Sequence, residues 1–260
     1  FMEKNTGDFA TLIVNFGNII QHQGRLKDAE KLIRTGIDIL EKANISSSSF
    51  LQGQSRVQLG NVLVYQKKYA AAMAQFNCAK QAMQPNQYIY NRQLSQNPNL
   101  ILALLMTGRT KEAMSLINRI YDFNKKSFGE THYLTAEILG LRAVAHFSMK
   151  RYKLSLDDFS HAVPILLERE NADADDYSKN FRLKIIIESY LDLISQLHGR
   201  QLDTNIKIVL LEEAFKLAGV ISDRTVQSAI GAGSARAAAA EYPDLADLIR
   251  REQDTLKQID

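Results

Sequence analysis

One pattern of small and bulky residues recurs at a nearly constant interval, and it constrains the fold more than any other feature of the chain. A small residue stands at positions 29, 72, 113 and 155, so that successive copies lie 43, 41 and 42 residues apart. A bulky residue follows four positions later in every copy, at 33, 76, 117 and 159. Two positions that keep one period over four copies predict a helical repeat protein, in which each unit packs on its neighbours.

The clearest copy runs from Gly60 to Ala79 and predicts the end of one helix, a short turn at residues 66–68 and a second helix. Apolar residues of the second helix recur at i, i+3, i+7 and i+10, which places them on one face. They are Tyr69, Ala72, Phe76 and Ala79. Gly60 allows the two backbones to approach closely, and we expect Phe76 to fill the space between them.

We therefore expect an all-α fold of five antiparallel helix pairs in residues 1–218, with the fifth formed by 181–197 and 206–217. Residues 219–260 are expected to form a helical cap or linker. The serines at 46–49 suit a helix cap before Phe50. Asn97 suits a cap with Pro98 in the first helical turn; the alternative is a helix that begins near Asn86 and is kinked at Pro98.

Composition and charge argue against several classes of protein. The net charge is only +3, from 32 basic and 29 acidic residues, which does not favour nucleic acid as a partner. No apolar run approaches the roughly 20 residues that span a membrane. The single cysteine, Cys78, cannot form an internal disulfide, and this favours a reducing, cytoplasmic location. Within its helix, Cys78 is expected to be a buried small apolar residue.

The chain shows no pattern of residues that indicates catalysis. Its five histidines lie in different copies without metal-ligand spacing, although His146 and His161 could face each other within one pair. Gly231 and Gly233 follow a predicted helix rather than a strand, so a dinucleotide site lacks its context. We therefore expect no enzyme activity, metal or cofactor in this chain.

The repeat resembles the tetratricopeptide repeat, through the small, aromatic and Ala pattern of the second helix and the Leu59-Gly60 pair of the first. Its period, longer than the usual 34 residues or so, is similar to that of kinesin light chains, as is the turn from Gly129 to His132. The resemblance implies a right-handed superhelix whose first helices line a concave groove. Such a groove binds a protein or a peptide.

Two asparagines mark this groove, because Asn18 and Asn61 each follow the glycine of a first helix. An Asn side chain can both donate to and accept from the backbone of an extended peptide. A simple polar surface is the alternative interpretation. The predicted peptide-binding residues are Asn15, Asn18, His22, Gln54, Gln58, Asn61 and Tyr65.

The last fifty residues resemble the segment that joins tetratricopeptide arrays to caspase-like CHAT domains in bacterial proteins. The matching features are Ala214-Phe215, Arg224, Val226-Gln227, 234–236 and 245–253. The resemblance implies a regulatory interaction module that controls a peptidase domain downstream of this chain. An adaptor that assembles other proteins is the alternative. We expect the amphipathic stretch Pro243–Asp260 to contact the downstream domain and to link it to the array.

Overall fold

The computed structural model describes residues 2–168, 177–198 and 210–219, with side chains from residue 6 onward. The chain forms two compact units, residues 1–190 and 191–260. In the second unit, residues 210–219 are helical, with Leu210 and Leu217 buried. The predictions for the segment 220–260 lie outside the described residues. The boundary between array and linker at 218/219 stays a prediction.

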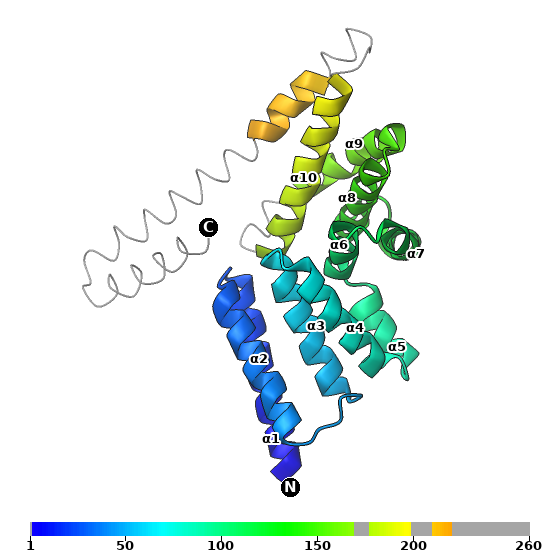
Figure 1. The fold of residues 1–260 in the computed structure, drawn as a ribbon. Helices are drawn as coiled ribbons and strands as arrows, with labels where there is room; N and C mark the ends of the chain where they lie inside the picture. Colours follow the sequence, from blue (N-terminus) through cyan, green and yellow to red (C-terminus); the bar gives the residue numbers. More distant parts are fainter. Residues whose placement is uncertain (1, 169–176, 199–209, 220–260) are drawn as a thin grey trace, which may run out of the picture. The chain divides into compact units, whose positions relative to one another are not determined.

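Among the described residues, every regular element is a helix and none is a strand, as predicted for an all-α fold (Figure 1). In the first unit, neighbouring helices pack as consecutive pairs, α1 with α2, α3 with α4, α6 with α7 and α8 with α9, and each pair contacts the next. The helices are α1 (Met2–His22), α2 (Leu26–Lys42), α3 (Phe50–Tyr65), α4 (Tyr69–Met83), α5 (Gln87–Tyr90), the π-helix η1 (Asn91–Ser95), α6 (Pro98–Met106), α7 (Thr110–Phe128), α8 (Tyr133–Ser148), α9 (Tyr152–Glu168) and α10 (Tyr177–His198).

The two repeating positions form the core between the helices of each pair. All four small residues and all four bulky residues are fully buried on the second helices α2, α4, α7 and α9. On the first helices, a Cβ on Gly17 would lie 2.7 Å from Cγ1 of Ile33, and a Cβ on Gly60 would lie 2.5 Å from Cε1 of Phe76. These glycines therefore permit the close approach that the sequence predicts.

The turn inside each pair also repeats, through a residue with positive φ. These residues stand at 24, 67, 108 and 150, again 43, 41 and 42 positions apart. In the second pair, the amide N–H of Lys68 donates to the carbonyl of Leu63 at 2.8 Å and closes the end of the helix. Glycine fills the left-handed position twice and lysine fills it twice: Gly24 (φ 79°), Lys67 (59°), Gly108 (75°) and Lys150 (58°).

The predicted helix starts agree with the structure. Ser49 accepts a hydrogen bond from the amide of Gln52 at 3.2 Å and caps α3. Asn97 accepts from the amide of Asn99 at 2.9 Å and caps α6, with Pro98 in its first turn. The alternative start at Asn86 also exists, because Asn86 caps α5, but η1 ends at Ser95, before Pro98.

The prediction for Cys78 is wrong, because its side chain is exposed. The neighbouring positions Phe76 and Ala79 are the ones that face the core of the pair. A helix advances by roughly 100° per residue, so a position between two core positions can point to solvent. Cys78 therefore does not contribute to the buried interface.

Candidate interaction site

The predicted groove residues lie on two first helices, α1 and α3, at equivalent positions. Asn15, Asn18 and His22 on α1 correspond to Gln58, Asn61 and Tyr65 on α3, each 43 residues later. The side chains of Asn15 and His22 are exposed, those of Asn18, Gln54, Gln58 and Asn61 are half-buried, and that of Tyr65 is buried. The peptide-binding role of these seven residues stays a prediction.

The residues of α3 make hydrogen bonds to the start of α6. Oδ1 of Asn61 accepts from Nδ2 of Asn97 at 2.8 Å and from Nδ2 of Asn99 at 3.1 Å. The same amide of Asn99 donates to the hydroxyl oxygen of Tyr65 at 2.7 Å. The acceptor oxygen of Asn61 and the hydroxyl of Tyr65 therefore hold the second and third helix pairs together.

A buried ion pair extends this network to α8 and α10. Nε of Arg182 donates to Oε1 of Glu137 at 2.8 Å, and the two side chains are only 10% and 2% exposed. Nη1 of Arg182 donates to the hydroxyl oxygen of Tyr65 at 3.2 Å and to Oδ1 of Asn99 at 3.3 Å. Burial disfavours the charged guanidinium, but the charge of Glu137, the hydrogen bond to it and the nearby Tyr65 and Tyr133 together outweigh burial and raise the pKa of Arg182 above its ordinary value.

Aromatic rings of α10 pack beside this network. The ring centroid of Tyr65 lies 5.3 Å from that of Phe181 and 5.9 Å from that of Tyr177, both in edge-on geometry. Tyr177 also reaches the turn between α1 and α2, because a Cβ on Gly24 would lie 3.2 Å from its ring. The first turns of α10 therefore cover the end of α3 where Tyr65 lies.

Sequence reasoning missed this network, because its residues belong to four helices. Tyr65 and Arg182 are 117 positions apart, and Glu137 and Arg182 are 45 apart. Asn61 was predicted as a groove residue and Asn97 as a helix cap, whereas Asn99, Glu137 and Arg182 carried no signal in the sequence. Nothing in the repeat pattern indicated that they meet.

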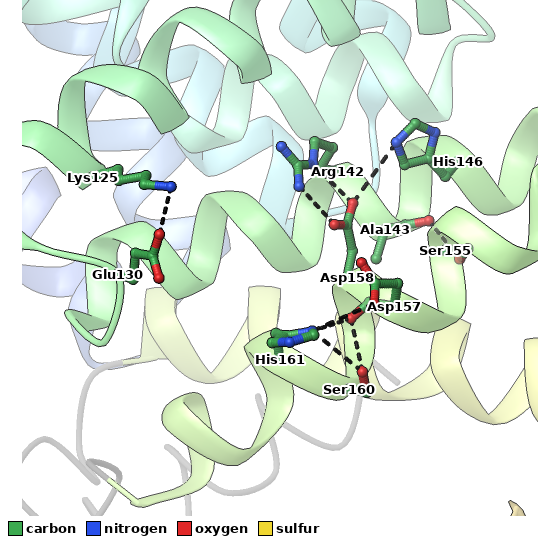
Figure 2. Close-up of polar contacts among 10 residues, drawn as sticks. All are labelled: Lys125, Glu130, Arg142, Ala143, His146, Ser155, Asp157, Asp158, Ser160 and His161. Carbon is green, nitrogen blue, oxygen red and sulfur yellow. Dashed lines mark hydrogen bonds and ion pairs between the residues drawn. The ribbon is translucent and has the colours of Figure 1, made fainter.

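A second polar cluster lies in the fourth pair, where Arg142 and His146 of α8 face Asp158 of α9 (Figure 2). Arg142 donates to both carboxylate oxygens of Asp158, at 2.7 and 2.8 Å. The hydrogen bond to Asp158 raises the pKa of Arg142 against the effect of burial. Nε2 of His146 lies 3.8 Å from the same carboxylate, and burial lowers the pKa of the imidazole below its ordinary value.

The two histidines of the fourth pair contact different acidic residues. His161 is exposed, and its Nδ1 lies 2.7 Å from the backbone oxygen of Asp157 and 3.9 Å from the carboxylate of that residue (Figure 2). His146 lies instead beside Asp158. Across the part of the chain that the structure describes, no group of three or more His, Cys, Asp or Glu side chains could hold a metal ion.

Comparisons with known proteins add no family to this geometry. No protein-family model matches the chain, and no curated protein matches it. None of the described helices has the length and apolar character that a membrane-spanning helix needs. The class that the fold defines is an all-α protein of consecutively packed helix pairs.

Proposed function

We propose that this chain is a protein-interaction module that binds an extended segment of a partner protein along the polar face of α1 and α3. The observation that carries the proposal is the repetition of hydrogen-bonding side chains at equivalent positions of two successive first helices. Asn15 and Gln58 form one such couple, and Asn18 and Asn61 form another. All four side chains are at least partly accessible to solvent.

The chemistry of these side chains suits a peptide backbone. An amide side chain offers two donors and one acceptor oxygen, so it can pair with the N–H and the C=O of an extended chain whatever residues that chain carries. The oxygen of Asn61 already accepts from Asn97 and Asn99, so this residue offers only its donor group to a ligand. Each such hydrogen bond contributes roughly 0.5–1.5 kcal/mol. The four amide side chains carry no charge, so we expect binding that changes little with salt concentration.

The resemblance to tetratricopeptide arrays extends the proposal. A right-handed superhelix would place these first helices on a concave surface, and the resemblance of the last fifty residues implies a caspase-like CHAT peptidase domain downstream. Binding of a partner to the array would then control the peptidase. An adaptor without a downstream peptidase is the alternative, and the complete reading frame of the gene distinguishes the two.

A displayed library of random 12-residue peptides tests the binding face. Peptides are selected on the full chain and measured against the double variant Asn15→Ala/Asn18→Ala, which spares the network of Asn61. We expect the selected peptides to bind this variant at least about fivefold more weakly, because two hydrogen bonds of roughly 0.5–1.5 kcal/mol each are lost. Asn77→Ala, at an exposed position on α4, is the matched control and should leave affinity unchanged.

Equal affinity of the selected peptides for the wild type and the double variant would rule out this face as their site. A more conservative change tests Asn61 itself. Asn61→Asp keeps the oxygen that accepts from Asn97 and Asn99, so the fold should persist while the donor group is removed. Loss of peptide affinity with an unchanged melting temperature would support a direct contact of Asn61 with the ligand.

A further inference from the structure

A third face of α1 carries an exposed apolar stripe, distinct from the face that packs on α2 and from the polar face proposed above. The stripe consists of Phe9 (56% exposed), Leu12 (64%), Phe16 (51%) and Ile19 (56%). Their spacing of i, i+3, i+7 and i+10 places them in one row over about three helical turns. Isolated exposed apolar residues are ordinary on proteins, but a continuous row of this length indicates an interaction surface.

The equivalent row is buried in the second pair. Adding the repeat interval of 43 leads to Gln52 (1% exposed), Ser55 (4%), Leu59 (1%) and Val62 (0%) on α3. α3 contacts both α1 and α2, the two helices of the preceding pair. The row on α1 is therefore the same surface that α3 uses to pack on a neighbouring helix pair.

The later pairs repeat this behaviour. Two of the four positions fall on α6, at Leu100 and Ala103, and both are buried. On α8, Thr135, Ile138 and Ala145 are buried, and Arg142, at the position of Phe16, is half-buried. Both helices contact the pair that comes before them, since α6 packs on α4 and α3, and α8 packs on α7 and α6. The stripe of α1 therefore corresponds to the surface through which the first helix of each later pair packs on the pair before it.

The size and chemistry of the stripe suit a single helix. The four side chains leave on the order of 400 Å² of apolar surface exposed, if a fully exposed aromatic residue offers about 200 Å². A stable dimer interface needs about 800 Å² from each partner. Between Thr6 and Gln21 the only charged residue is Asp8, so ion pairs contribute little to the choice of a binding partner by the stripe.

We propose that the α1 stripe binds an amphipathic α-helix of a partner protein, which packs on α1 as α2 packs on α3. Such a helix carries apolar residues at i, i+3 or i+4 and i+7 toward the stripe and polar residues on its outer side. This surface is separate from the peptide-binding face, so it goes beyond the proposed function and can be tested independently of it.

The test uses the full chain and a fluorescent peptide with the sequence of α2, residues 26–42. A hydrocarbon staple that replaces Ala29 and Ile33 keeps the peptide helical, which an isolated helix of this length would not be in water. These two residues face α1 in the intact protein, next to Gly17. The neighbouring face of the peptide, which includes Ile37 and Asp38 and adjoins Leu59 of α3 around a hollow of about 240 Å³, remains free to bind.

We expect saturable binding of the peptide to the wild-type chain. Phe16→Asp should weaken it at least about tenfold, because the variant places a charge where an apolar contact is required. Leu154→Asp changes a residue of similar exposure (50%) on α9 and should leave affinity unchanged. A peptide with Ile37→Asp should also bind at least about tenfold more weakly, and Asn15→Ala/Asn18→Ala should bind the original peptide normally.

Three results would overturn the proposal. The first is absence of peptide binding to a wild-type chain that is folded by circular dichroism. The second is equal binding by Phe16→Asp, which would place the peptide elsewhere. The third is a wild-type dimer in sedimentation that Phe16→Asp converts to a monomer, because a second copy of the chain would then occupy the stripe.

Discussion

The second and fourth helix pairs, α3–α4 and α8–α9, have the same backbone plan but fill three equivalent positions with different chemistry. The second pair has two buried leucines, Leu59 and Leu63, on α3, and Gln75 on α4. The fourth pair has Arg142, His146 and Asp158, each 83 positions later. Both pairs keep a phenylalanine in the bulky position and a lysine with positive φ in the turn.

This difference shows which positions carry the repeat. The small and bulky positions set how closely the two helices approach, and they stay apolar or small in every copy because backbone geometry depends on them. The positions beside them can change to polar residues when they change together. Arg142 and Asp158 satisfy each other with two hydrogen bonds, which offsets the cost of taking their charges out of water.

The largest loss of stability should come from removing the buried phenylalanine that the two pairs share. Phe76→Ala should lower the free energy of unfolding by about 3–5 kcal/mol, the usual cost of deleting a buried aromatic side chain. Phe159→Ala should cost at least as much, because its ring also stacks on Tyr190 of α10 at 4.9 Å. Urea denaturation measures both. A loss below about 1 kcal/mol for either variant would show that the bulky position does not hold the pair together.

The next largest loss of stability should follow from changing Asp158, one of the three positions at which the two pairs differ. Asp158→Ala should cost about 2–3 kcal/mol, because it leaves the half-buried guanidinium of Arg142 without its partner. Gln75→Ala, at the equivalent position, should cost less than about 1 kcal/mol. Equal losses in urea denaturation would mean that Asp158 acts only through packing.

Exchanging the whole set sharpens this test. The triple variant Arg142→Leu/His146→Leu/Asp158→Gln gives the fourth pair the residues of the second. We expect it to recover the stability that Asp158→Ala loses, because apolar replacement of a buried ion pair is often neutral or stabilising. If the triple variant is less stable than Asp158→Ala, the fourth pair requires its polar cluster for another reason.

A smaller effect should distinguish the turns. Gly108→Ala should destabilise by about 1 kcal/mol because alanine is strained at positive φ; space is not the cause, since nothing lies within 4 Å of the added Cβ. Lys150→Gly should stabilise the protein by about 0.5 kcal/mol. Glycine removes the strain of positive φ, and this gain exceeds the additional conformational entropy that glycine loses on folding. Thermal melting of both variants checks these opposite signs, and a destabilised Lys150→Gly would contradict them.

The smallest effect concerns pH and His146. Burial lowers the pKa of this imidazole in the folded protein, so below about pH 6.5 the unfolded chain binds a proton that the folded chain resists. Stability from this group is therefore present above the unfolded pKa and declines as pH falls from there toward the lowered folded pKa. His146→Leu should flatten the decline of unfolding free energy in this range. An identical decline in the variant would assign it to other groups.

The sequence by itself determined the repeat and the local starts and stops of the helices. Ala72 and Phe76, with their counterparts in the other copies, predicted the buried face of each second helix, and Ser49 and Asn97 predicted the caps. These features depend on helix geometry and on contacts between residues close together in the chain. The spacing of residue types therefore predicts them. The period also placed the candidate groove residues on the first helices.

Only the tertiary structure decided which of those residues are committed to other contacts. Arg182 reaches Tyr65 and Asn99 from more than eighty positions away, and no repeat interval relates them. The pattern likewise gave α1 and α3 an equivalent row of residues, yet the row is buried on α3 and exposed on α1. Burial depends on which helices meet in space, and a short-range pattern in the sequence does not contain that information.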